Sequence, residues 1–358
     1  MEINWRLEQL TADEQQAAER LSTELDISLA AGRILAGRGL RTAAKARAYI
    51  RPTRDSLHDP FLMRDMTAAV DRLCRAIDNH ERIMVYGDYD VDGTTAVALM
   101  YSFLRTQTDN LIYYIPDRYT EGYGISTKGI DTAKEKGCTL VIALDCGIKA
   151  VEKMEYANSI GVDFIICDHH TPGDITPKAV AVLNMKRADC HYPFKELSGC
   201  GVGFKLAQAY AQRRGIDMQE VYRLLPLLAM SIASDIVPVT GENRILAFYG
   251  LRALNAQPSV GLQAIMQVAG IADKNITMSD LVYKFGPRIN AAGRIKSGAE
   301  AVRLLITDDA EAALRFAKDI DSYNQDRRDY DSKTTDEALE QLQQDPMNSS
   351  KHTTVVFS

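Results

Sequence analysis

The chain has 358 residues, of which 46% are hydrophobic and 25% charged, and its formal net charge of −6 excludes a uniformly basic nucleic-acid coat or a polybasic membrane binder. No run of about 18 apolar residues is present, so we expect no transmembrane helix and no membrane partner. Six scattered cysteines without a C-x-x-C pair, in a chain whose start does not resemble a signal peptide, predict a cytoplasmic protein with reduced thiols.

Residues 1–80 are expected to be mainly helical and amphipathic, with a boundary near Pro52 and the His58-Asp59-Pro60 turn. From Arg82 onward, short apolar runs alternate with helical patterns, which is typical of βαβ units. The expected strands are 83–86, 111–115, 140–144, 164–167 and 179–183, and the helices between them are 94–104, 126–136 and 149–159. The pattern therefore predicts an α/β fold in which helices flank a mostly parallel sheet.

The remaining segments predict how this α/β unit is extended at both ends. We expect residues 1–56 to form a helical N-terminal extension, 57–306 the main α/β domain, and 307–344 a long connecting helix whose polar composition lacks the a/d regularity of a coiled coil. In residues 345–358 a strand begins near Thr353 and stops, so we expect the start of a truncated second domain there.

Acidic and imidazole side chains follow the predicted strands at equivalent places. Asp88, Asp90 and Asp92 come after the first strand, Asp145 after the third, and Asp168, His169 and His170 after the fourth. Asp235 follows a separate apolar helix over 224–233. Because ligands of parallel sheets bind beyond the carboxyl ends of the strands, we expect these groups to converge.

Such a cluster of carboxylates is unfavourable unless cations balance its charge. Oxygen ligands with one or two imidazoles suit Mn²⁺ or Mg²⁺, and the number of carboxylates exceeds what one ion requires. Two ions about 3.5–4 Å apart are the arrangement that phosphatases and nucleases use. Taken singly, each aspartate is equally compatible with a helix N-cap and the histidine pair with a structural role, so the prediction rests on the whole set.

The motifs Gly87-Asp88-Tyr89-Asp90-Val91-Asp92-Gly93, Asp145-Cys146-Gly147 and Asp168-His169-His170 resemble, in this order, those of the DHH phosphoesterase superfamily. Three further segments resemble its RecJ branch, the single-strand-specific exonucleases. They are Ser198–Lys205, Ala233–Pro238 and Gly286–Arg294. In that family a DHH-associated second domain follows the connecting helix, which agrees with the strand expected near Thr353.

The resemblance implies a role for each member of the cluster. It implies that Asp88, Asp90 and Asp92 contribute to the metal site, and that Asp90 and Asp92 bind the ions directly. Asp145 is implied as the bridge between two ions, with His169 and Asp235 on one of them. His170 is implied to face the scissile phosphate as a hydrogen-bond donor or acid, and Asp168 to orient a histidine.

Two basic segments are candidates for binding the substrate. Residues 281–299 contain Lys284, Arg288, Arg294 and Lys296 and no acidic residue, so Arg288, Asn290 and Arg294 are expected to contact phosphates, against the simpler interpretation of a solvated basic loop. Gly201 and Gly203, before a helix expected to begin near Phe204, allow close backbone approach to a phosphate, and Lys205 adds charge. Arg118 is expected to bind a terminal phosphate, beside a tyrosine that stacks on a base.

The favoured interpretation is a two-metal phosphodiesterase that degrades single-stranded nucleic acid. The resemblance adds 5′-to-3′ polarity, DNA as the strand, and a role in DNA repair and recombination. The alternatives are a phosphodiesterase for short oligonucleotides or cyclic dinucleotides, and a scaffold without activity. Members of the first class usually carry an Asn-Pro-Asp-x-Asp motif where this chain has Asp88-Tyr89-Asp90, and the scaffold is expected to have lost ligands that this chain retains.

Overall fold

The computed structural model of the protein describes residues 9–344, so the strand expected near Thr353 lies outside the described residues. A five-stranded parallel sheet forms the centre of the α/β domain, in the order β2-β1-β3-β4-β5. Its strands are β1 (Arg82–Gly87), β2 (Leu111–Tyr114), β3 (Cys138–Leu144), β4 (Asp163–Cys167) and β5 (Ala181–Leu183). The α/β class and the parallel sheet predicted from the sequence are confirmed.

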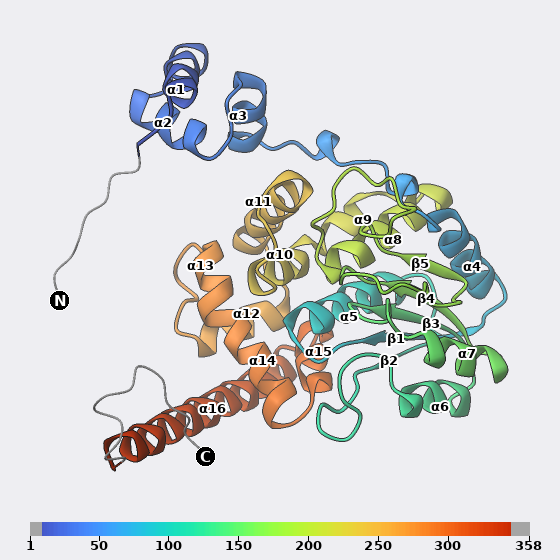
Figure 1. Cartoon of the computed structure of the whole chain (residues 1–358). Helices are drawn as coiled ribbons and strands as arrows, with labels where there is room; N and C mark the ends of the chain where they lie inside the picture. Colours follow the sequence, from blue (N-terminus) through green and yellow to red (C-terminus); the bar gives the residue numbers. More distant parts are fainter. Residues whose placement is uncertain (1–8, 345–358) are drawn as a thin grey trace.

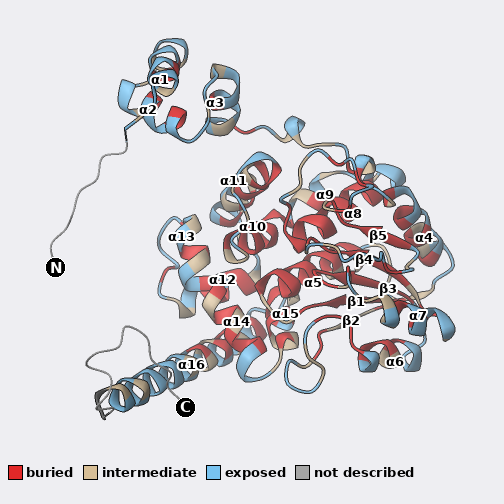
Figure 2. Cartoon of the chain, in the orientation of Figure 1, coloured by how far each residue is buried: buried red, intermediate tan, exposed pale blue. Residues whose placement is uncertain are grey.

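The strand residues alternate between two hydrophobic cores, as expected of a sheet with helices on both faces. Ile83, Ile142 and Ile165 contribute to the core that includes residues of α4 (Met66–Asp78), α5 (Val91–Leu104) and α8 (Gly199–Arg214). Met84 and Ile166 contribute to the opposite core, beneath α6 (Thr127–Glu135) and α7 (Val151–Ser159). The sheet is therefore buried on both faces (Figure 2).

A second group of helices packs beside α5 and α8 and includes the elements that carry Asp235 and the basic segment. These helices are α9 (Gln219–Tyr222), α10 (Leu225–Ser234), α11 (Gly241–Ala256), α12 (Val260–Val268), α13 (Met278–Asp280), the π-helix η3 (Leu281–Phe285), α14 (Gly286–Ile295) and α15 (Gly298–Ile306). The first half of α16 (Ala310–Gln344) packs against α12 and α14, and its second half is exposed and projects from the core (Figures 1 and 2).

The N-terminal helices form a small unit with its own core. This unit consists of α1 (Ala12–Leu25), α2 (Leu29–Gly37) and α3 (Ala43–Ile50), which bury Ala18, Leu21 and Leu35 among them. The short helices η1 (Arg54–Ser56) and η2 (Pro60–Leu62) lead from the unit to α4 (Figure 1). Among the described residues, no helix combines the length and apolarity needed to span a bilayer.

One difference from the sequence-based expectation concerns α8. The helix begins at Gly199 instead of near Phe204, so the three glycines lie in its first two turns. A Cβ on Gly199 would lie 2.5 Å from Cβ of Asp145, and one on Gly203 would lie 2.9 Å from the Leu144 side chain. The glycines therefore let α8 approach the carboxyl end of β3 closely, which places the helix start beside the metal cluster.

The close approach of α10 and α11 gives a prediction about stability. A Cβ on Gly250 would lie 2.3 Å from the backbone oxygen of Leu225. We expect Gly250→Ala to lower the free energy of unfolding by about 1–3 kcal/mol, because the two backbones must separate. Gly173→Ala is the control, since its nearest neighbour would be 3.9 Å away. Urea denaturation measures both, and equal stability of the two variants would contradict the packing.

Candidate metal centre

The turn after β1 brings three aspartates to the edge of the sheet. Asp88 follows the strand directly, Asp90 caps α5 by accepting a hydrogen bond from the backbone N–H of Gly93 at 2.9 Å, and Asp92 lies in the first turn of the helix. A Cβ on Gly93 would lie 2.4 Å from the backbone oxygen of Asp88. The absence of a side chain at Gly93 therefore lets the first turn of α5 pack directly against the backbone of Asp88.

Asp92 holds the start of α8 against the cluster. Its Oδ2 accepts from the N–H of Gly199 at 2.6 Å, and its Oδ1 accepts from Cys200 at 2.9 Å and from Ser231 Oγ at 2.6 Å. A carboxylate at a helix N-terminus satisfies unpaired N–H groups and is stabilised by the helix dipole. Asp92 therefore has a structural role in addition to its position near His169.

Asp145 lies at the centre of the cluster. It has a φ of 60°, a left-handed conformation that aspartate tolerates better than most residues. Its Oδ1 is buried, accepts no hydrogen bond and lies 3.2 Å from Nε2 of His169. The same His169 nitrogen lies 3.6 Å from Oδ2 of Asp235, at the end of α10, and 3.7 Å from Oδ2 of Asp92. One imidazole is thus surrounded by three carboxylates that come from three separate segments.

The residues after β4 form a hydrogen-bonded chain that leads out of the cluster. Asp168 is buried and accepts from the Ile148 N–H at 2.8 Å and from its own neighbours, including Nδ1 of His170 at 2.7 Å. On the other side, Nε2 of His170 lies 3.1 Å from the hydroxyl of Tyr123. Asp168 and Tyr123 therefore fix the orientation of His170, whose side chain is 43% exposed.

The ionisable groups fall into three sets whose candidate ligand atoms lie within 4.8 Å of one another. These sets are Asp88, Asp90 and Asp145; Asp145, His169 and His170; and Asp92, His169 and Asp235. Asp145 and His169 each belong to two sets, so the cluster contains more candidate ligands than one ion requires. Cysteine is absent from all three, and such oxygen-rich sets suit Mn²⁺ or Mg²⁺ better than structural zinc.

Several buried ligand atoms have no hydrogen-bond partner. They are both carboxylate oxygens of Asp88, Oδ1 of Asp145, Oδ2 of Asp235 and both ring nitrogens of His169. Buried polar atoms are nearly always hydrogen-bonded, so their accumulation at one edge of the sheet needs an explanation. Divalent cations supply it, because they would bind these atoms and balance their charge.

The pKa values of these groups reflect the same crowding. Burial, followed by the charge of Asp90, raises the pKa of Asp88 to about 7, and burial with the charge of Asp92 raises the pKa of Asp235 to about 8. The pKa of Asp145 is raised well above its ordinary value for the same reasons, and burial lowers the pKa of His169. The hydrogen bond to Asp168 instead raises the pKa of His170, which favours its protonated form.

Lys205 differs from the expectation that it binds substrate. Its side chain is completely buried, and Nζ lies 2.6 Å from Oε1 of Glu242 and 3.0 Å from the backbone oxygen of His58. The backbone N–H of Gly201 is also not free to bind a phosphate, because it donates to Ser198 Oγ. The N–H groups at the start of α8 are thus bound by Asp92 and Ser198 of this chain, and the buried Lys205–Glu242 pair links α8 to α11.

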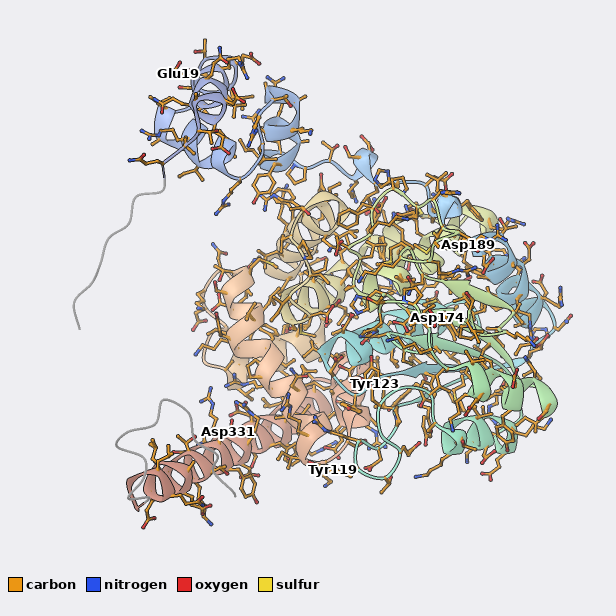
Figure 3. The ribbon with its side chains drawn as sticks, viewed as in Figure 1. Glu19, Tyr119, Tyr123, Asp174, Asp189 and Asp331 are labelled. Carbon is orange, nitrogen blue, oxygen red and sulfur yellow. The ribbon has the colours of Figure 1, made fainter. Side chains whose placement is uncertain are left out.

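The basic segment is divided between the interior and the surface. Arg288 is buried, with Nε 2.8 Å from Oδ1 of Asp321, so it joins α14 to α16 instead of facing solvent. Asn290 is half-buried and Arg294 is exposed. The Tyr119 hydroxyl donates to the backbone oxygen of Arg294 at 2.7 Å, which joins this segment to the loop between β2 and α6 (Figure 3).

Arg118 and Tyr123 lie on that same loop, near the first motif. The guanidinium of Arg118 is 5.3 Å from the ring centre of Tyr89, and the Tyr123 ring makes an edge contact with the same tyrosine. The hydrogen bonds of Tyr123 to His170 and of Ser231 to Asp92 were not anticipated. Ser231 has a signal in the sequence, since it is a polar residue in the interior of the mainly apolar helix α10.

The comparisons with known proteins agree on one family. Residues 82–232 match the model of the DHH family, N-terminal domain. The chain is 36% identical over 342 residues to the single-stranded-DNA-specific exonuclease RecJ of Bacillus subtilis, covering 96% of this chain and 42% of that protein. It is 33% identical over 318 residues to RecJ of Escherichia coli, covering 86% and 54%. It therefore spans about half the length of these relatives.

Solved structures give the same result for the fold. A crystal structure of exonuclease RecJ bound to manganese superposes with a TM-score of 0.72 at 30% identity, covering 78% of this chain and 70% of that one. RecJ of Thermus thermophilus in complex with Mn²⁺ superposes with a TM-score of 0.77 at 26% identity, covering 92% and 47%. Motifs, sequence identity and superposition together show that this chain belongs to the RecJ branch of the DHH family.

Proposed function

We propose that this chain is the catalytic core of a metal-dependent phosphodiesterase that degrades single-stranded DNA from its 5′ end. The observation that carries the proposal is the set of buried, unpartnered ligand atoms on Asp88, Asp145, His169 and Asp235. Two Mn²⁺ or Mg²⁺ ions fit this set in number and in ligand type. When bound, such ions lower the pKa of an attacking water and balance charge on the phosphoryl oxygens.

The side chains of this centre would bind the ions, donate a proton and hold the strand. Asp90, Asp92, Asp145, His169 and Asp235 would hold the ions, with Asp145 positioned to reach both, and Asp88 would add a carboxylate beside Asp90. His170, oriented by Asp168, would donate a proton or a hydrogen bond to the scissile phosphate or the leaving oxygen. Arg118 and Arg294, which are exposed cations of two neighbouring segments, would hold the phosphates of the strand.

The choice of DNA and of the 5′ end is supported by the family. The names of the similar Bacillus and Escherichia proteins specify single-stranded DNA, and the 5′ polarity is what the family resemblance implies. By the same resemblance we assign the activity to DNA repair and recombination. Free cysteines among the described residues are compatible with the cytoplasm as the compartment.

The direct test compares a long 5′-phosphorylated single strand with a dinucleotide as substrates in Mn²⁺. The proposal expects faster hydrolysis of the long strand, release of nucleotides from its 5′ end, and no reaction in EDTA. Equal or faster turnover of the dinucleotide would favour the short-oligonucleotide phosphodiesterase instead. Failure to hydrolyse either substrate, together with absent Mn²⁺ binding by calorimetry, would favour the scaffold.

Substitution of Asp145 tests the shared ligand. Asp145→Asn keeps the shape of the side chain but removes the charge that lies beside His169, so we expect hydrolysis to fall by more than about 100-fold and Mn²⁺ binding to weaken. Asp174→Asn, at an exposed aspartate after β4 (Figure 3), is the control and should match the parent rate. Near-normal hydrolysis by Asp145→Asn would contradict the assigned position.

His170 is predicted to act on the substrate instead of holding an ion. His170→Ala should lower hydrolysis by about 10²–10⁴-fold while leaving Mn²⁺ affinity within a few-fold of the parent. Calorimetry in Mn²⁺ and single-turnover kinetics measure the two effects separately. Collapse of the Mn²⁺ affinity would identify His170 as a ligand.

The raised carboxyl pKa values predict how metal removal changes stability. Without metal, Asp88 and Asp235 hold protons up to pKa values of about 7 and about 8, whereas in the unfolded chain they release them near pH 4. The free energy of unfolding in EDTA should therefore fall as pH rises from about 4 to about 8. Mn²⁺ should raise the melting temperature most at pH 8.

Asp88→Asn provides the control for this dependence, because it removes one of the crowded charges. In EDTA at pH 8 this variant should be more stable than the parent, and its stability should decline less with pH. Urea denaturation at fixed pH values measures the difference. A metal-free parent that gains stability over this pH range would show that the cluster is not the dominant titrating feature.

A further inference from the structure

The N-terminal unit carries the strongest concentration of positive charge in the chain. Between Asp26 and Asp55 there is no acidic residue, and the segment contains Arg33, Arg38, Arg41, Lys45, Arg47, Arg51 and Arg54. Arg41 pairs with Glu14, and Arg54 lies over the rings of two tyrosines. In a chain with a net charge of −6, such a segment is suited to bind a polyanion.

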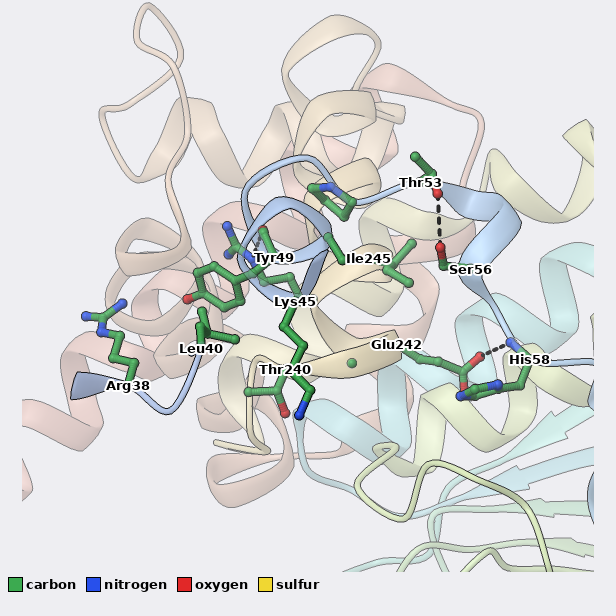
Figure 4. Close-up of a pocket in the computed structure, with 14 residues that line it drawn as sticks. Arg38, Leu40, Lys45, Tyr49, Thr53, Ser56, His58, Thr240, Glu242 and Ile245 are labelled. Atoms are coloured by element: carbon green, nitrogen blue, oxygen red, sulfur yellow. Dashed lines mark hydrogen bonds between the residues drawn. The ribbon is translucent and has the colours of Figure 1, made fainter. Parts of the chain in front are cut away.

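A cavity of about 610 Å³ lies between this unit and α11, and we call it the interunit pocket (Figure 4). It is lined by Arg38, Leu40, Lys45, Ala48, Tyr49, Pro52, Thr53, Ser56, His58, Thr240, Gly241, Glu242, Arg244 and Ile245. The N-terminal unit is held to α11 beside it, since Arg244 Nε donates to the backbone oxygen of Tyr49 at 2.8 Å. The pocket is therefore a defined feature of the packing between the two units.

The lining combines apolar walls with a cationic rim. Leu40, Pro52 and Ile245 supply apolar surface, and the Tyr49 ring lies under the Arg244 guanidinium at 3.9 Å. Arg38 and Lys45 are exposed and form no ion pair with any described residue. Apolar surface next to unpaired cations matches the two parts of a nucleotide, its base and its phosphate.

Glu242, the acidic residue in the lining, does not cancel the positive charge of Arg38 and Lys45. The carboxylate of Glu242 is buried and is occupied by Lys205 Nζ at 2.6 Å, the Tyr192 hydroxyl at 2.6 Å and the His58 N–H at 3.0 Å. Because Lys205 neutralises Glu242, Arg38, Lys45 and Arg244 leave the pocket with a net positive charge. An anionic ligand therefore meets no uncompensated carboxylate there.

A short segment connects the interunit pocket to the metal centre. Asp235 ends α10, and five residues later Thr240 already lines the pocket. Between them, Ile236 is 84% exposed and has a φ of 59°, an unfavourable conformation for a β-branched residue. This strained position presents apolar surface to solvent next to Asp235, within the segment that leads to Thr240.

We propose that the interunit pocket is a second binding site for single-stranded nucleic acid, which takes a base against its apolar wall and the adjoining phosphates on Arg38 and Lys45. The inference rests on the proposed function, since the strand is the one whose end reaches the metal centre. It adds a role for the N-terminal unit, which anchors a long strand at a distance from the point of hydrolysis. We expect a dinucleotide at the metal centre to be too short to occupy this pocket as well.

The test measures binding separately from hydrolysis. Fluorescence anisotropy in EDTA gives the Kd of a labelled long strand, and hydrolysis of the dinucleotide in Mn²⁺ reports on the metal centre. The Arg38→Ala/Lys45→Ala double variant should weaken strand binding about tenfold at low salt and reduce the slope of log K against log salt by about 1.4. Its rate on the dinucleotide should equal that of the parent.

Two further variants separate the pocket from general electrostatics. Arg33→Ala/Arg47→Ala removes the same charge from exposed positions of the unit outside the pocket lining, and should weaken binding much less. Ala48→Trp keeps every charge but fills the pocket, and should weaken binding of the strand. Equal loss in both double variants, or an unaffected Ala48→Trp, would overturn the proposal.

The outcomes also distinguish this inference from the proposed function. Strand binding that depends on the pocket, without hydrolysis in Mn²⁺, would retain the inference and reject the exonuclease. Hydrolysis of the long strand with unchanged Kd in the pocket variants would do the reverse. Parallel loss of dinucleotide hydrolysis in Arg38→Ala/Lys45→Ala would show a disturbed fold or centre and would also count against the pocket.

Discussion

Repulsion between buried carboxylates is the constraint around which this structure is arranged. Asp88, Asp90, Asp92, Asp145 and Asp235 lie within one small volume, where burial alone already raises the pKa of several of them. The protein neutralises only part of this charge itself, with the start of α8 on Asp92 and with backbone N–H groups and His170 on Asp168. The carboxylates that remain unpartnered define where cations belong.

The features that local patterns encode could be predicted from the sequence. Apolar runs bounded by turns give the parallel strands, and the position of Asp145 and Asp168 directly after such runs gives the convergence of the cluster. α5 begins at Val91, three residues earlier than expected, because Asp90 acts as its N-cap while belonging to the metal cluster. Because Asp90 is interpreted from the sequence mainly as a metal residue, its second role as the N-cap of α5 is not recognised there.

Features that depend on distant partners could not be predicted in this way. Lys205 and Arg288 appear as free cations in their own segments, but Glu242 and Asp321, which pair with them, lie about 35 residues further along the chain. The interunit pocket likewise forms only when α3 packs beside α11. The basic residues of the N-terminal segment are visible in the sequence, but the packing that places Arg38 and Lys45 beside α11 is not.

If Asp92 holds a metal ion as proposed, it links catalysis to folding more closely than a ligand on a surface loop would. Its carboxylate closes the N-terminus of α8, and it contacts α10 through Ser231, while an oxygen of the same group lies near His169. A lineage that lost the reaction would therefore still be under selection to keep this aspartate. Persistence of the residue in a distant homologue is, for that reason, weaker evidence of a working enzyme than persistence of Asp88, whose oxygens have no hydrogen-bond partner here.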